Sequence, residues 1–202
     1  MRVGVLASGN GTNLQALINA LNREGSPARV ELTICNVPGA KALERAQQAG
    51  VATELLPSKG VTDRAAYDAQ LVELLHQHHI EVVCLAGYMR LLTPVFLKAF
   101  PARVLNIHPS LLPSFPGMHA IRQAIEAGVK VTGCTVHFVD EGTDTGPIIA
   151  QTPVPVLDGD DENKLAERIH HEEHRLYPAV VSKLAAGPFL IQGRRVITQG
   201  AF

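Results

Sequence analysis

An asparagine and a histidine near the middle of this chain of 202 residues are the strongest candidates for chemistry. Asn106 and His108 end an apolar run in the segment RVLNIHPSLLP (103–113). Side chains two apart on a strand face the same way, so this pair is expected to project together where Pro109 turns the chain out of a sheet. An amide can stabilise an oxyanion and an imidazole can move a proton. A hydrogen-bonded core histidine is the alternative that spacing leaves open.

A second group is the segment VDEGTDTGP (139–147), which carries Asp140, Glu141 and Asp144 between glycines. Taken alone, it is typical of a solvated acidic hairpin loop. A carboxylate that reached His108 would favour the imidazolium and raise the pKa of the histidine. We therefore expect Asp144 to hold His108 protonated, if the two meet.

The segment ASGNGTNL (7–14) lies between an expected strand and helix. Gly9 and Gly11 would let backbone N–H groups converge at a helix N-terminus, which favours a phosphate, and Thr12 and Asn13 add donors. The spacing is not the dinucleotide fingerprint, and a Walker lysine is absent from the segment. A tight strand-to-helix turn with a polar cap is the alternative.

The segment RIHHEEHRLYP (168–178) places a carboxylate where an apolar side chain would be expected. At helical spacing Glu173 falls within the apolar stripe, so it needs a partner such as a ligand cation or amine. His170 and His174 have an i,i+4 spacing, but neither a cysteine nor a clear third ligand accompanies them. The sequence therefore predicts no metal.

The segment LAGYMRLL (85–92) has two interpretations. Met89, Leu91 and Leu92 are either core residues or an apolar slot for a flat ring. In the second case Arg64 and Arg90 would lie at the mouth of the slot and bind carboxylates.

Alternating strand and helix patterns predict how these groups are positioned. We expect strands over 2–8, 29–36, 51–57, 81–87 and 103–108, and helices over 12–23, 40–50, 63–79 and 94–99. This series predicts an α/β, Rossmann-like, mostly parallel sheet flanked by helices. The C-terminal half adds a helix over 118–128, an antiparallel pair over 130–139 and 146–156, a helix over 161–187 bent or interrupted near Pro178, and a terminal hairpin over 189–199.

Composition limits the classes of partner. The chain is 46% hydrophobic with a formal net charge of −1, so nucleic acid is not an expected partner. Its three cysteines lie far apart among apolar residues, as in a reducing compartment. With neither a signal peptide nor a membrane span in the pattern, we expect a cytoplasmic protein. We expect a single domain over 1–202, with halves of about 1–100 and 101–202.

Four segments together resemble the phosphoribosylglycinamide formyltransferase family, within the folate-dependent formyltransferases. They are SGNGTNLQAL, LAGYMRLL, LNIHPSLLPSFPG and GCTVHFVDEGTDTGPII. The resemblance runs from residue 1 to about 180. It implies that the chain transfers the formyl group of 10-formyltetrahydrofolate to the amine of glycinamide ribonucleotide in purine biosynthesis, by direct acyl transfer through a tetrahedral intermediate. It implies no resident metal.

The resemblance also implies roles for particular residues. Asn106, His108 and Asp144 would be catalytic, and the Leu112–Pro113 bond would be cis. The ribonucleotide would be bound by Gly11, Thr12, Asn13, His170 and Glu173. The N-terminal half would hold its phosphate, and the C-terminal half would be folate-binding and catalytic. The folate would be bound by Arg64, Met89, Arg90, Leu91, Leu92, Asn106, Asp140, Glu141, Gly142, Thr143 and Asp144.

Other functions remain alternatives at this point. A formyltetrahydrofolate deformylase would be expected to carry an N-terminal regulatory domain. A transfer-RNA formyltransferase would carry a C-terminal domain and a basic surface. A serine hydrolase using Ser110 lacks the G-x-S-x-G elbow. A non-catalytic nucleotide-binding module would not need the polar residues together. The oligomeric state is left as monomer or homodimer.

Overall fold

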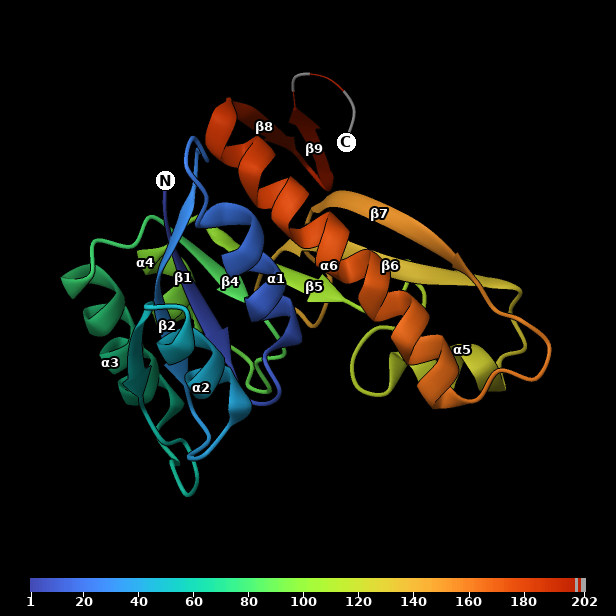
Figure 1. Ribbon diagram of the computed structural model, residues 1–202, viewed down its shortest axis with the longest axis horizontal. Coiled ribbons are helices and arrows are strands. Elements are labelled where there is room, and N and C mark those ends of the chain that lie inside the picture. Colours follow the sequence, from blue (N-terminus) through green and yellow to red (C-terminus); the bar gives the residue numbers. More distant parts are fainter. Residues whose placement is uncertain (199, 201–202) are drawn as a thin grey trace. The chain divides into compact units, whose positions relative to one another are not determined.

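Figure 1 shows a computed structural model of the protein, which describes residues 1–198 and 200. The chain divides into two compact units, Met1–Asn106 and Ile107–Phe202. The division falls within one strand, at its third residue. The predicted organisation as a single domain stays a prediction.

The first unit is a five-stranded parallel sheet in the order β3-β2-β1-β4-β5. Helices α1 and α2 lie on one face of this sheet and α3 and α4 on the other, and the helices of each pair contact one another (Figure 1). The elements are β1 (Arg2–Ala7), α1 (Thr12–Leu21), β2 (Arg29–Cys35), α2 (Lys41–Gln48), β3 (Ala52–Leu55), α3 (Arg64–Gln77), β4 (Val82–Leu85), α4 (Pro94–Ala99) and β5 (Val104–His108).

The central strands of this unit are apolar because helices cover both of their faces. Val3, Val5 and Leu6 of β1 are completely buried. A Cβ atom at Gly4 would lie 2.7 Å from Leu75 Cδ2, so α3 approaches this strand closely. The centre of the sheet in this unit is therefore packed with apolar side chains.

A buried carboxylate connects α3 to the start of α4. Asp68 is 2% exposed, and its Oδ2 accepts hydrogen bonds from Thr93 N at 2.6 Å and Thr93 Oγ1 at 2.7 Å. Thr93 is the N-cap of α4, and Pro94 follows at its first position, which suits proline. Asp68 thus fixes the end of the segment that leaves β4.

The second unit has an antiparallel β6–β7 pair covered by a long helix. Its elements are α5 (Ala120–Glu126), β6 (Val131–Phe138), β7 (Ile148–Pro155), α6 (Glu162–Ala186), β8 (Phe189–Gln192) and β9 (Arg195–Thr198). Cys134 and Val154 of the strands pack with Leu165 and Ile169 of α6. The strand order is β6-β7-β9-β8, with β9 parallel to β7 and antiparallel to β8.

The elements predicted from sequence are present, with shorter bounds in most cases. The mixed, mostly parallel sheet and the terminal hairpin are confirmed, although Gln199 of the predicted hairpin and residues 201–202 lie outside the described residues. Of the predicted bend or interruption near Pro178, the interruption is wrong, because α6 runs through the proline, and the bend stays a prediction. Tyr177, Val180 and Val181 are all fully buried around the proline, so packing on both sides offsets the lost hydrogen bond.

Two further expectations concern the backbone and the membrane. The Leu112–Pro113 peptide bond is cis, as the resemblance implied. Among residues 1–198 and 200, none of the helices combines the length and apolar character that crossing a bilayer requires.

Candidate active site

His108 is the last residue of β5 and is 5% exposed. Its Nε2 lies 2.8 Å from the carbonyl oxygen of Phe115, and its Nδ1 lies 3.4 Å from Oδ2 of Asp144. Both ring nitrogens therefore face oxygen atoms, and the predicted approach of Asp144 to His108 is present.

Asp144 is held from three directions. Its Oδ2 accepts a hydrogen bond from Gly117 N at 2.7 Å, and its Oδ1 lies 3.6 Å from Nε2 of His137. His137 is 2% exposed, and its Nδ1 lies 2.8 Å from the Phe138 carbonyl. The carboxylate thus bridges two buried histidines.

The contacts of His108 determine where its proton resides. A carbonyl oxygen only accepts hydrogen bonds, so Nε2 must carry hydrogen and donate to Phe115. In the neutral ring Nδ1 is then the basic nitrogen, and it faces the Asp144 carboxylate. A proton taken up at Nδ1 would be stabilised at once by Asp144. His108 is therefore arranged to accept a proton and then to hold it.

The expectation that Asp144 keeps His108 protonated is corrected by burial. Burial lowers the pKa of His108, and nearby His137 lowers it further, while the Phe115 carbonyl and Asp144 act to raise it. The net result is a pKa below the usual 6.5, because desolvation of the imidazolium outweighs the carboxylate. His108 is mostly neutral at pH 7.

Asp144 itself stays ionised. Burial would raise the pKa of its carboxyl group, but hydrogen bonds from His137 and the Gly117 amide, together with the positive charge that the histidines can carry, lower it more. Its net pKa is below the usual value. A permanent negative charge thus lies beside the basic nitrogen of His108.

The loop that carries Asp144 has a fixed path. Asp140 Oδ1 accepts hydrogen bonds from Gly142 N at 3.1 Å and Thr145 Oγ1 at 2.7 Å. A Cβ atom at Gly146 would lie 1.8 Å from the carbonyl oxygen of Phe138, so only glycine fits where the loop rejoins β7. Asp140, Glu141, Gly142 and Thr143 are exposed, whereas Asp144 is half-buried. The loop is therefore acidic and solvated only in part.

Ser110 is not arranged as a nucleophile. It is completely buried, and its Oγ donates to the carbonyl oxygens of Ser114 at 2.6 Å and Phe115 at 3.4 Å. His108 directs Nε2 at the same Phe115 carbonyl and Nδ1 toward Asp144, so neither ring nitrogen is directed at the Ser110 hydroxyl. This geometry argues against a serine hydrolase.

In the first unit, the loop after β1 opens α1 at the point where the strand order reverses. Open α/β sheets bind ligands at such a point, beyond the carboxyl ends of the strands. Gly11 has φ +71° and is the N-cap of α1, and a Cβ there would lie 2.8 Å from Ala42 Cα. No side chain caps this end of the helix. Thr12 and Asn13 begin the helix, so the predicted phosphate donors share one helix N-terminus.

The segment after β4 lies against this loop. Ser8 N donates to the Gly87 carbonyl at 3.2 Å, and Met89 N donates to Ser8 Oγ at 2.9 Å. Met89 is 67% exposed and Leu91 is 59% exposed, so the interpretation of these two as core residues is wrong. Leu92 is half-buried. Apolar side chains are therefore presented to solvent beside the helix N-terminus.

The two arginines predicted near this segment make different contacts. Arg64 Nη2 donates to the Leu91 carbonyl at 2.7 Å. The guanidinium carbon of Arg90 lies 4.6 Å from the centre of the Tyr67 ring, and its Nη1 donates to the Ser58 carbonyl at 3.4 Å. Arg64 thus binds the backbone of the exposed apolar segment, and Arg90 stacks on the Tyr67 ring.

Glu173 occupies the inward position that its helical spacing predicts. It is 3% exposed, on the face of α6 that buries Leu165 and Ile169. His170 is exposed, and its ring centre lies 6.4 Å from that of His174. This helix thus carries a buried carboxylate and, three residues before it, an exposed imidazole.

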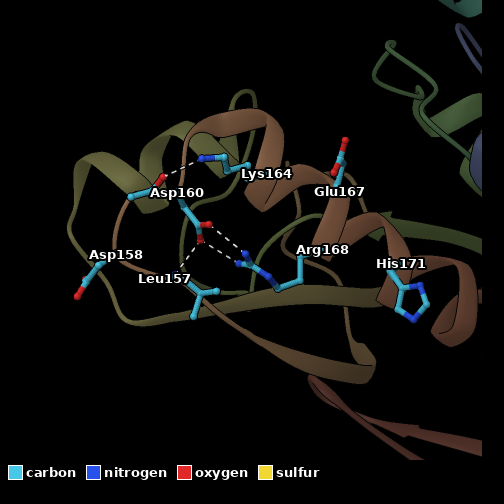
Figure 2. A pocket seen from close by; sticks show the side chains of 8 residues that line it. Leu157, Asp158, Asp160, Lys164, Glu167, Arg168 and His171 are labelled. Carbon is cyan, nitrogen blue, oxygen red and sulfur yellow. Dashed lines mark hydrogen bonds and ion pairs between the residues drawn. The ribbon is translucent and has the colours of Figure 1, made fainter.

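A separate hollow near the start of α6 contains none of the predicted site residues (Figure 2). It has a volume of about 630 Å³, and Arg168 spans it to pair with Asp160 at 2.9 and 3.0 Å. Its lining is Leu157, Asp158, Gly159, Asp160, Lys164, Glu167, Arg168 and His171. Because its central charges pair with each other, we assign it no chemistry. Among the described residues, no three His, Cys, Asp or Glu side chains gather to hold a metal ion.

Comparison with known proteins shows the family of the chain. The family described as formyl transferase matches residues 1–181. The chain belongs to the formyl transferase family. It is 44% identical to a phosphoribosylglycinamide formyltransferase of Bacillus subtilis, over 91% of this chain and 94% of the relative. A crystal structure of glycinamide ribonucleotide transformylase 1 from Symbiobacterium toebii matches with a TM-score of 0.95 and 52% identity, over 98% of this chain and 93% of that one.

Longer relatives of this formyl transferase also match. The trifunctional purine biosynthetic protein adenosine-3 of Drosophila melanogaster is 49% identical over 94% of this chain. The match spans only 14% of that protein's length.

His137 of this formyl transferase is not among the site residues predicted from the sequence. It lies on β6 among apolar neighbours, where a histidine is usually a hydrogen-bonded core residue. The alternation of side chains along a strand was the one sequence signal that could have found it: His137 and Thr135 are two apart, so both project from the same face of β6. Only the contact with Asp144 distinguishes it from a structural histidine.

Proposed function

We propose that this formyl transferase moves the formyl group of 10-formyltetrahydrofolate to the amine of glycinamide ribonucleotide, a step of purine biosynthesis. The observation that carries the proposal is the buried His108–Asp144 contact at 3.4 Å, with the opposite ring nitrogen tied to the Phe115 carbonyl. Acyl transfer to an amine requires such a group, because the attacking nitrogen must lose a proton and the leaving nitrogen must gain one.

We propose the following course of reaction. The amine nitrogen attacks the formyl carbon, a C–N bond forms, and the carbonyl oxygen becomes an oxyanion. Asn106 donates to that oxygen, a contribution of about 3 kcal/mol. Neutral His108 accepts the amine proton at Nδ1, and Asp144 stabilises the imidazolium. When the bond from the formyl carbon to N10 breaks, His108 returns the proton to N10. No covalent intermediate with the protein is needed.

The binding roles are proposals of the same kind. Gly11, Thr12 and Asn13 would bind the ribonucleotide phosphate, supported by the uncapped N-terminus of α1. Glu173 and His170 would contact the remainder of that substrate. A folate would meet Arg64, the segment from Met89 to Leu92, Asn106 and the loop from Asp140 to Asp144; the exposure of Met89 and Leu91 supports an apolar contact with a flat ring.

We propose a cytoplasmic enzyme that acts as a monomer or homodimer, with both substrates as small molecules and without nucleic acid, membrane or resident metal.

One experiment separates this proposal from folate hydrolysis. Purified protein is incubated with 10-formyltetrahydrofolate, with and without glycinamide ribonucleotide, and tetrahydrofolate is measured. The proposal predicts turnover only when the ribonucleotide is present. Equal turnover without it would establish a deformylase instead, and binding of the ribonucleotide without any turnover would indicate a binding module.

A further inference from the structure

The turn from Ser110 to Phe115 presents the carbonyl that fixes the proton of His108, so whatever holds this turn controls the base. Phe115 has φ +54°, a conformation that a bulky residue seldom adopts unaided. Its carbonyl oxygen lies 2.8 Å from His108 Nε2. The turn therefore needs support from outside itself.

Thr135 of β6 supplies the first support. It is completely buried, and its Oγ1 donates to the Ser110 carbonyl at 2.7 Å. The same oxygen accepts from Leu112 N at 3.1 Å and from Gln151 Nε2 at 2.9 Å. Because both of those partners are N–H donors, the hydroxyl hydrogen can only point at Ser110. This hydroxyl makes one donated and two accepted bonds, which uses its full capacity.

Gln151 of β7 supplies the second support. It is the register partner of Thr135 in the β6–β7 pair. Its Nε2 donates both to Thr135 Oγ1 and to the Leu112 carbonyl, each at 2.9 Å. One amide group thus binds the supporting hydroxyl and the turn together. The two side chains clamp both the N–H and the carbonyl group of Leu112.

The hydrogen bonds of Thr135 and Gln151 are connected to His108 through the turn. Ser110 is anchored at its carbonyl by Thr135, and its own Oγ donates to the carbonyls of Ser114 and Phe115. The path from Thr135 to His108 therefore consists of hydrogen bonds and the backbone from Ser110 to Phe115, with four residues between these two.

We propose that Thr135 and Gln151 are positioning residues that hold the Ser110–Phe115 turn so that the Phe115 carbonyl keeps the proton of neutral His108 on Nε2. If the turn moved, Nε2 would lose its acceptor, and the proton would shift to Nδ1, where Asp144 accepts it. A ring protonated at Nδ1 no longer offers its basic nitrogen beside Asp144. The effect on catalysis rests on the proposed function, but the effect on the tautomer does not.

Strand β6 offers a matched control for this proposal. Thr132 is 1% exposed on the same strand, and its buried Oγ1 has no hydrogen-bond partner. Being three residues from Thr135, it projects from the opposite face. Thr132→Val and Thr135→Val replace the same buried hydroxyl by the same methyl group. Only the second removes bonds to the turn.

The test is nitrogen NMR of ¹⁵N-histidine-labelled protein without ligands, together with kcat and KM for formyl transfer. Thr135→Val should shift His108 away from the Nε2–H signature and lower kcat by about 10²-fold, as for a base displaced by about 1 Å. Thr132→Val should leave both at wild-type values. Thr135→Ser, which keeps the hydroxyl, should restore both. Gln151→Met should change both in the same direction by a smaller factor.

A folded Thr135→Val protein with the wild-type tautomer and kcat would overturn the proposal. If Thr135→Val does not fold, Gln151→Met decides by the same two measurements, since Gln151 is exposed and its replacement leaves the core intact. If the wild-type protein shows the Nε2–H signature but transfers no formyl group, the proposed function fails. The role of Thr135 and Gln151 is then decided by the histidine NMR of the variants alone.

Discussion

Replacing Asp144 by asparagine removes the negative charge beside His108 and leaves the shape of the side chain nearly unchanged. The amide can still accept the hydrogen bond that Gly117 N gives to Oδ2 at 2.7 Å. The loop is also held by Asp140 and by the tight fit at Gly146, so Asp144→Asn should fold normally. The change therefore isolates the charge.

The loss can be worked out from the distance of 3.4 Å between His108 Nδ1 and Asp144 Oδ2. Two unit charges at this separation interact by about 5 kcal/mol at an effective dielectric constant of about 20. The interaction exists only while His108 carries the proton, so it stabilises the transition state and not the resting enzyme. At about 1.4 kcal/mol per decade, we expect kcat to fall by about 10³-fold.

The assay is formyl transfer at saturating substrates, with ligand binding followed by calorimetry. Binding of both substrates should stay within a few-fold of wild type. Asp158→Asn is the matched control, because it makes the same chemical change at a side chain that is 94% exposed and paired with Lys130. A kcat for Asp144→Asn within tenfold of that control would refute the role given to the charge.

Three other predictions concern stability. Gly146→Ala should lower the free energy of unfolding in urea by about 3 kcal/mol, because its Cβ would lie 1.8 Å from the Phe138 carbonyl oxygen. Gly187→Ala is the control, because open space surrounds that position, and equal unfolding midpoints for the two variants would contradict the steric argument. Asp68→Asn should cost about 1.5–3 kcal/mol, since the carboxylate accepts two buried hydrogen bonds; an unchanged unfolding midpoint would show that this anchor is dispensable. Burial lowers the pKa of His108 below 6.5, so the unfolded chain takes up the proton at a higher pH than the folded protein, and stability falls as the pH drops through 6.5 toward the folded pKa. His108→Asn should flatten that part of the curve of unfolding free energy against pH, and an unchanged slope would assign the pH dependence to other groups.

Much of the fold follows from local pattern. Strand β4 is apolar throughout, and β1 is apolar after Arg2, because both faces are covered. The alternation of such strands with helical periods then predicts a mostly parallel sheet. The continuity of α6 was not predictable in this way. Pro178 removes one backbone hydrogen bond, a local signal, but the packing of its buried neighbours is decided by strands distant in sequence.

The candidate site was predictable where spacing along one element determines geometry. Asn106 and His108 share β5, and Glu173 shares the buried face of α6. The role of His137 was not predictable, because its contact with Asp144 depends on how β6 and the following loop fold back. Nor was the protonation of His108: a nearby carboxylate suggested a raised pKa, whereas the depth of burial, a property of the whole unit, lowers it.

The fate of the formyl carbon tests the central claim most directly. Protein is mixed with 10-formyltetrahydrofolate labelled with ¹³C at the formyl carbon and with glycinamide ribonucleotide, and the products are followed by carbon NMR. Direct transfer predicts one labelled formamide on the ribonucleotide for each tetrahydrofolate formed, and a wild-type reaction that His108→Asn abolishes. Label released as formate, or transfer that persists in His108→Asn, would contradict the account.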